Sequence, residues 1–110
     1  MLENASHRLA EARSLELHRA VAARLRSEPE LLERARERVA GWRSSGTVSE
    51  HYVEAWTKLL SAGVAAVTAA LEEQSESAHD LRQSSPFAGV LDARTRWRIR
   101  KEVREELERG

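Results

Sequence analysis

Hydrophobic residues recur every three or four positions along most of this chain, which is the spacing of one face of an α-helix. The first run spans about residues 5–26, where Leu17, Val21 and Leu25 form a stripe. The second run ends at Ser44-Ser45-Gly46. Neither contains the long alternation of apolar and polar residues that marks a strand. We therefore predict two helices in this part of the chain.

Two further hydrophobic runs meet at Gly63, one on each side. Glycine costs about 1 kcal/mol in a helix interior relative to alanine, so we predict a kink or a short break at residues 61–63. The polar stretch of residues 75–85 predicts a short helix that contains Leu81 and lies between two loops.

Capping signals indicate where the helices begin. Two pairs of residues have the spacing of a capping box: Ser27 with Glu30, and Thr47 with Glu50. In a capping box, the two side chains satisfy backbone N–H groups of the first helical turn. Asp92 is expected to cap a last helix over about residues 93–108.

These patterns predict an all-α fold, a small bundle of four to six helices with no sheet. The 110 residues suit a single domain, in which residues 1–14 are expected to be a loosely packed N-terminal extension. The expected core residues come from the longer helices: Leu17, Val21, Leu25, Leu32, Val39, Val53, Leu60, Val67, Ile99 and Val103.

Composition narrows the functional classes. The chain has no cysteine, which excludes disulfides, a thiolate nucleophile and cysteine zinc sites. Its 18 basic and 18 acidic residues give zero formal charge, which argues against a general nucleic-acid binder. The first residues lack a signal-peptide run, and no stretch approaches the ~20 apolar residues that span a bilayer. We expect a cytoplasmic protein that contacts no membrane and uses no cofactor.

The last predicted helix has two different faces. Ile99 and Val103 lie four residues apart on a core-facing stripe, and Trp97 lies about 200° round the helix from Ile99. Residues 94–104 hold six basic residues and one acidic residue, a balance of +5. Residues 44–93 hold two basic and seven acidic residues, a balance of −5. Charge is therefore segregated along a neutral chain.

Two interpretations of this helix are open. In the first, its arginines form a solvated face that pairs with the acidic residues 44–93, and Trp97 packs under a loop. In the second, part of the helix is a docking face for an acidic partner, because tryptophan and arginine are enriched at interface hot spots. The residues of that face are Arg94, Trp97, Lys101 and Arg104.

The segment LRQSSPFAGVL (81–91) has the most unusual sequence in the chain. Ser85 and Pro86 can serve as the cap and the first residue of a single helical turn. Two roles are open for Phe87, the only phenylalanine. It plugs the base of the last helix together with Val90 and Leu91, or it tips a rigid loop that inserts into a pocket of a partner.

Residues for catalysis or metal binding form no pattern. The histidines are His7, His18, His51 and His79. No two of them are three or four residues apart, which excludes a helical metal clamp of the HExxH kind. No motif sets a serine beside a histidine, although pairing of distant residues in the fold stays open. We expect neither a metal site nor an enzyme.

Five strings together resemble a group of small, mostly actinobacterial helical proteins. They are LHRAVAARLR (17–26), ARERVAGW (35–42), EAWTKLL (54–60), LRQSSPFAGVL (81–91) and RTRWRIRKEVREEL (94–107). Proteins of this group resemble antitoxins, and their genes stand beside a gene for a nucleotidyltransferase-like toxin. The resemblance implies an antitoxin and draws attention to its most specific residues: Ser85, Pro86, Phe87, Gly89, Arg96 and Trp97.

The leading hypothesis is therefore the antitoxin of a bacterial toxin–antitoxin pair, which neutralises a toxin enzyme encoded by the adjacent gene through direct protein–protein binding. The predicted partner-binding residues are Phe87, Arg94, Trp97, Lys101 and Arg104. The second hypothesis is a small helical DNA-binding regulator that uses the basic last helix. The third is a structural protein that forms a homodimer through Trp42 and Trp56.

Overall fold

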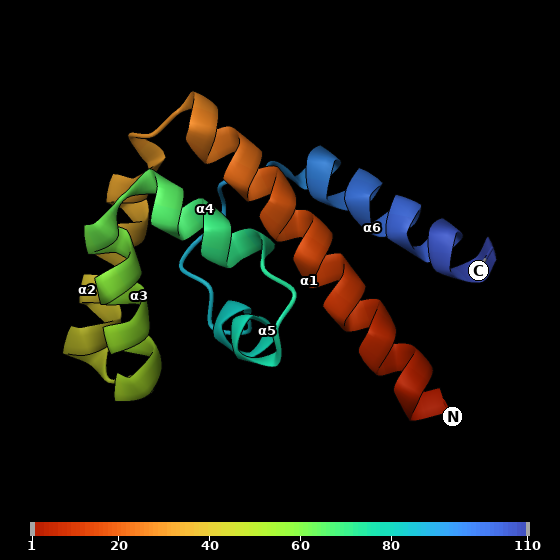
Figure 1. The fold of residues 1–110 in the computed structure, drawn as a ribbon, viewed down its shortest axis with the longest axis horizontal. Coiled ribbons are helices and arrows are strands. Elements are labelled where there is room, and N and C mark those ends of the chain that lie inside the picture. Colours follow the sequence, from red (N-terminus) through yellow and green to blue (C-terminus); the bar gives the residue numbers. More distant parts are fainter. Residues whose placement is uncertain (1, 110) are drawn as a thin grey trace.

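Helices make up the fold of the computed structural model, which describes residues 2–109, with side chains from residue 6 onwards (Figure 1). In order they are α1 (Leu2–Ser27), α2 (Leu31–Ser45), α3 (Glu50–Ala62), α4 (Val64–Glu72), α5 (Glu76–Arg82) and α6 (Ala93–Arg109). Residues 2–109 contain no strand, so the predicted all-α class is confirmed. None of the helices in this range is long and apolar enough to cross a bilayer.

The long helix α1 organises the arrangement, because α4, α5 and α6 all pack on it. α6 lies alongside the N-terminal half of α1, whereas α2 and α3 form a helical hairpin at the other end of the molecule (Figure 1). The molecule measures 41 × 30 × 23 Å as a result. Residues 2–14 continue α1 without a break, and Leu9 and Ala12 pack against the core. Residue 1 of the expected extension lies outside the described residues.

One hydrophobic core joins the helices. Nine of the ten predicted core residues are buried, and the tenth, Leu17, is half-buried at its edge. Trp56 of α3 has no exposed surface and lies edge-to-face against Phe87, with ring centroids 5.8 Å apart. Because Trp56 is fully buried in the core, it cannot contribute to the predicted homodimer contact through Trp42 and Trp56, and that part of the prediction is wrong. Trp42 is half-buried.

Both predicted capping boxes are wrong. Ser27 is the last residue of α1, and its hydroxyl donates to a carbonyl one turn back, so α2 begins only at Leu31. Thr47 hydrogen-bonds to Ser45 through its hydroxyl, and Ser49 precedes α3. Serine and threonine side chains bond readily to nearby groups, and these local bonds compete with the capping geometry.

Three other predicted boundaries are confirmed. α3 and α4 separate at Gly63, whose φ of 104° suits glycine and few other residues. Leu81 lies in the short helix α5. α6 begins directly after Asp92, whose Oδ1 accepts a hydrogen bond from the backbone N–H of Thr95 at 2.7 Å. That hydrogen bond lowers the pKa of Asp92.

Candidate functional site

The exposed side of α6 carries a large aromatic side chain. Among residues 6–109, Trp97 is the one large hydrophobic residue in the exposed class, with 63% of its surface exposed. Ile99 and Val103 take the core-facing side of the same helix, so Trp97 points outward. The ammonium group of Lys101 lies 5.2 Å from the centroid of its ring, a cation–π contact. The interpretation in which Trp97 packs under a loop is therefore wrong.

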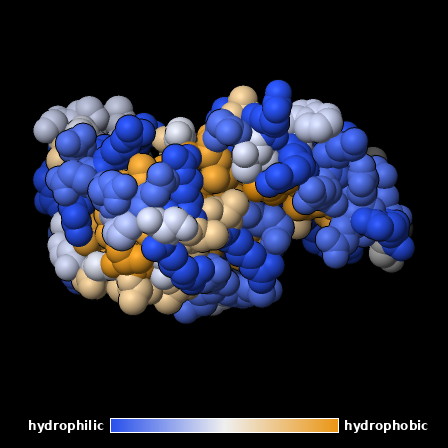
Figure 2. Space-filling view, turned by 90° about the horizontal axis from the view of Figure 1, so that it is seen from above, coloured by the Kyte–Doolittle hydropathy of each residue, from blue (hydrophilic) through white to orange (hydrophobic). Residues whose placement is uncertain are grey.

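A shallow groove of about 600 Å³ runs beside Trp97, between α6 and α1. Its charged residues are Arg13, Arg100, Lys101, Arg104, Glu105 and Glu108. Among the described residues of its lining, four cations stand against two carboxylates, a net charge of +2. Figure 2 shows that hydrophilic residues dominate the surface at this end of the molecule, whereas hydrophobic residues reach the surface mainly over the other end.

Few cations of this side have an ionic partner among the described side chains. Within residues 6–109, Arg94, Arg100 and Arg104 make no ion pair, and Lys101 reaches Glu105 only at 4.0 Å. We refer to the exposed residues Arg94, Trp97, Lys101 and Arg104 as the outer face of α6. Because these cations have little to neutralise them, the outer face is electrostatically suited to an acidic partner.

The acidic residues in the middle of the chain pair elsewhere. Among the described side chains, no ion pair joins residues 94–104 to residues 44–93, so the predicted pairing between these segments is wrong. Glu72 of α4 instead pairs with Arg26 of α1, and the hydrogen bonds from this guanidinium lower the pKa of the Glu72 carboxyl. The pair reinforces the contact between α1 and α4.

Phe87 lies away from the outer face of α6. It is 4% exposed, and its backbone N–H donates to the Ser85 hydroxyl at 3.3 Å. The predicted insertion of Phe87 into a partner's pocket is therefore wrong, because the aromatic ring is already enclosed by the core. The alternative is confirmed: Phe87 and Val90 are both buried in the segment that leads into α6.

A histidine–serine pair has no counterpart among the sequence predictions. His18 of α1 and Ser85 lie 67 residues apart in sequence. The Nδ1 of His18 donates to the carbonyl of Ser14 at 2.7 Å, so Nε2 of the neutral ring accepts from the Ser85 hydroxyl at 2.9 Å. Burial lowers the pKa of His18, and the positive charge of Arg82 lowers it further. The only signal in the sequence is that His18 adjoins the hydrophobic stripe of its helix.

Arg82 has a structural role that its place in an acidic stretch did not suggest. The side chain is 3% exposed, and its Nη1 donates to three carbonyls at the end of α4. The acceptors are Ala70, Leu71 and Glu73, at 3.1, 3.3 and 2.7 Å. Helix ends leave carbonyls without partners, and a cation is favourable at a helix C-terminus. Arg82 thus caps α4 from α5.

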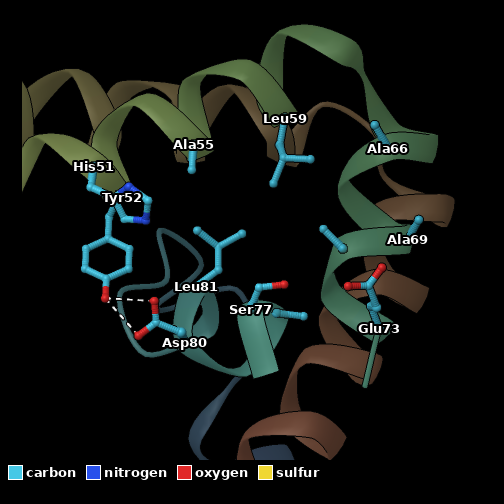
Figure 3. A pocket seen from close by; sticks show the side chains of 12 residues that line it. His51, Tyr52, Ala55, Leu59, Ala66, Ala69, Glu73, Ser77, Asp80 and Leu81 are labelled. Carbon is cyan, nitrogen blue, oxygen red and sulfur yellow. Dashed lines mark hydrogen bonds between the residues drawn. The ribbon is translucent and has the colours of Figure 1, made fainter. Parts of the chain in front are cut away.

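A second groove, of about 440 Å³, lies between α3, α4 and α5 (Figure 3). Alanine and leucine side chains form most of its lining. The hydroxyl of Tyr52 donates to both carboxylate oxygens of Asp80, at 2.8 and 2.9 Å, and this raises the pKa of Tyr52. Glu73 accepts a hydrogen bond from Ser75. These polar groups at its rim are already engaged with one another.

Neither groove resembles a metal centre: among residues 6–109, no three histidine or acidic side chains are arranged to hold an ion. The outer face of α6 is therefore the candidate functional site, and it contains four of the five predicted partner-binding residues. Comparison of the chain with protein-family models, with curated proteins and with solved structures gives no match.

Proposed function

We propose that this protein is an antitoxin that neutralises a toxin enzyme by direct binding, with the outer face of α6 as its docking surface. The observation that carries the proposal is the exposure of Trp97 beside a groove of net positive charge. A tryptophan presented on a helix and surrounded by arginine and lysine has the composition of an interface hot spot. An indole ring also offers a large apolar area together with one N–H donor, which suits it to the pocket of a partner.

The sequence resemblance supplies the class of partner, a nucleotidyltransferase-like enzyme encoded by the adjacent gene. Such an enzyme holds its metal with carboxylates, so the mouth of its active site is acidic. The cations of α6 would be drawn to this mouth and would orient the antitoxin over it. Trp97 would then supply the apolar contact that electrostatic steering alone does not provide.

The first test is genetic. Expression of the adjacent gene alone should stop growth, and co-expression of this protein should restore it. A neighbouring product that is harmless, or that stays toxic when both proteins are made, contradicts the antitoxin function.

The second test locates the docking surface with purified proteins. We expect Trp97→Ala to weaken toxin binding by about 2 kcal/mol or more, as truncation of a hot-spot residue does. The double variant Arg94→Glu/Arg104→Glu should slow association and weaken binding, because it reverses two charges of the face. The matched control is Arg34→Glu/Arg38→Glu, which reverses two exposed arginines of α2.

The outcomes of this second test are distinct. If the control variant loses binding and the α6 variants keep it, the docking surface lies on α2. If the α6 variants instead lose a salt-dependent affinity for duplex DNA, and the wild-type protein binds no toxin, the outer face serves DNA binding.

A further inference from the structure

A small pocket of about 240 Å³ lies between α1, the segment between α5 and α6, and the first turn of α6. Its walls are largely apolar and include Leu17, Val21 and Leu91. It shares no lining residue with the groove beside Trp97. The pocket is therefore distinct from the groove beside Trp97.

Polar side chains in the lining of this pocket include His18, Ser85 and Arg96. None of the described residues that line it is acidic. Within residues 6–109, Arg96 makes no ion pair, so its guanidinium has no carboxylate to neutralise it. Arg82 adds a second positive charge to the lining. An apolar pocket with a few polar groups is the usual form of a small-ligand site, and the charge here favours an anion.

We propose that this pocket binds a small monocarboxylate with a short apolar tail. The carboxylate pairs with Arg96, whose planar guanidinium matches the two carboxylate oxygens, and the tail lies on Leu17 and Leu91. A single negative charge fits best, because the guanidinium of Arg82 is buried and its Nη1 is already bonded to the carbonyls of α4.

The pair of His18 and Ser85 serves this site as a polar wall and is not built for acyl transfer. The residue after Ser85 is Pro86, which has no backbone N–H, and the N–H of Phe87 points at the Ser85 hydroxyl itself. The backbone of these two residues therefore offers no donor to the oxyanion that would form on a substrate attacked by Ser85. Stabilisation of that oxyanion supplies much of the rate of acyl transfer. A carboxylate bound beside His18 instead favours the imidazolium and raises the pKa of His18.

The test is a titration of the whole protein with hexanoate, followed by nuclear magnetic resonance of the backbone amides and the histidine rings. We expect saturable shifts at residues 17–21 and 85–91 and a rise in the pKa of His18. Hexanol, which has the same chain without the charge, should bind at least about tenfold more weakly, since charge-assisted hydrogen bonds are the strong ones.

Variants of two arginines complete the test. Arg96→Gln should weaken hexanoate binding at least about tenfold, because it removes the charge that pairs with the carboxylate. Arg98→Gln, an exposed arginine of α6 that does not line the pocket, should bind hexanoate as the wild type does. The proposal would be overturned if hexanol bound as tightly as hexanoate, or if Arg96→Gln and Arg98→Gln weakened hexanoate binding equally. It would also be overturned if the shifts were confined to the groove beside Trp97 or did not saturate.

Discussion

The indole N–H of Trp56 donates a hydrogen bond to the carbonyl oxygen of Ser84, with an N···O distance of 2.6 Å. The bond joins α3 to the segment that leads into α6, and the same indole ring contacts Phe87 edge-to-face. A buried tryptophan normally needs a partner for its N–H, and this carbonyl is the partner. A residue of α3 therefore anchors the segment that leads into α6.

Trp56→Phe should destabilise the protein measurably. The change leaves the Ser84 carbonyl without its donor, which costs about 1–3 kcal/mol, and adds a small cavity. Trp56→Ala should cost about 3–5 kcal/mol. Urea denaturation followed by circular dichroism measures both values. A loss below about 0.5 kcal/mol for Trp56→Phe would mean that this hydrogen bond contributes little.

Trp97→Ala should leave the stability of the isolated protein nearly unchanged. Its side chain is 63% exposed, and exposed substitutions usually change stability by less than about 0.5 kcal/mol. Thermal denaturation beside Trp56→Ala gives the direct contrast between an exposed and a buried tryptophan. A large fall in the melting temperature of Trp97→Ala would place this ring in the core instead.

Stability should fall as the pH drops below about 6.5, the ordinary pKa of histidine, because burial lowers the pKa of folded His18. Below this pH, His18 of the unfolded chain binds a proton, whereas the buried His18 of the folded protein stays neutral. Acid therefore favours unfolding. The contribution of His18 is complete above pH 6.5 and is lost as the pH falls toward its lowered pKa.

Urea denaturation at several pH values checks this dependence on His18. His18→Gln does not titrate in this range, so the loss between pH 7.5 and 5.5 should shrink. His51→Gln, at an exposed position, should keep the loss of the wild type. An unchanged slope in His18→Gln would assign the acid sensitivity to other groups.

Arg82→Met should cost about 3 kcal/mol of stability, because it leaves three carbonyls at the end of α4 without a charged donor. Arg36→Met is a matched control, since Arg36 also donates to a carbonyl, that of Leu60, from an exposed side chain. This control should lose less than about 1 kcal/mol. Equal losses in the two variants would show that burial of Arg82 does not matter.

Two glycines should respond to alanine in opposite directions. Gly63→Ala forces a side chain onto a φ of 104°, which costs about 1–3 kcal/mol. Gly41 lies inside α2 with open space where a Cβ would stand, so Gly41→Ala should stabilise by about 0.5–1 kcal/mol. Chemical denaturation of both variants measures the difference. A stabilised Gly63→Ala would contradict the strain at that position.

Local patterns predicted the helices and most of the core, and they placed Trp97 off the core-facing stripe of its helix. The hydrophobic stripes predicted the buried faces correctly, because residues three and four apart form one face of a helix whatever lies elsewhere in the chain. Trp97 lies off the stripe of Ile99 and Val103, which left open whether a loop covers it, and the structure shows the ring exposed. Gly63 and Asp92 act on their own backbone or on the next turn, so their effects are also local.

Long-range packing decided the features that local patterns left open or missed. The sequence left two roles open for Phe87, and its contact with Trp56 of α3 in the core decides for burial. The pairing of His18 with Ser85 joins residues that only the folded chain brings together. In the sequence, nothing distinguishes Arg82 from the other charged residues, yet in the structure its side chain donates a hydrogen bond to a carbonyl at the end of α4. The spacing of residues along the chain does not predict any of these contacts.

The contact of α6 with α1 determines how easily α6 can detach from the rest of the protein. α6 rests chiefly on one neighbour, so its undocking breaks one interface and requires less free energy than global unfolding. We expect its amide hydrogens to exchange with solvent sooner than those of the more enclosed α4. A partner that binds across both helices, or a ligand held between Arg96 and α1, would slow that exchange by holding this local opening closed.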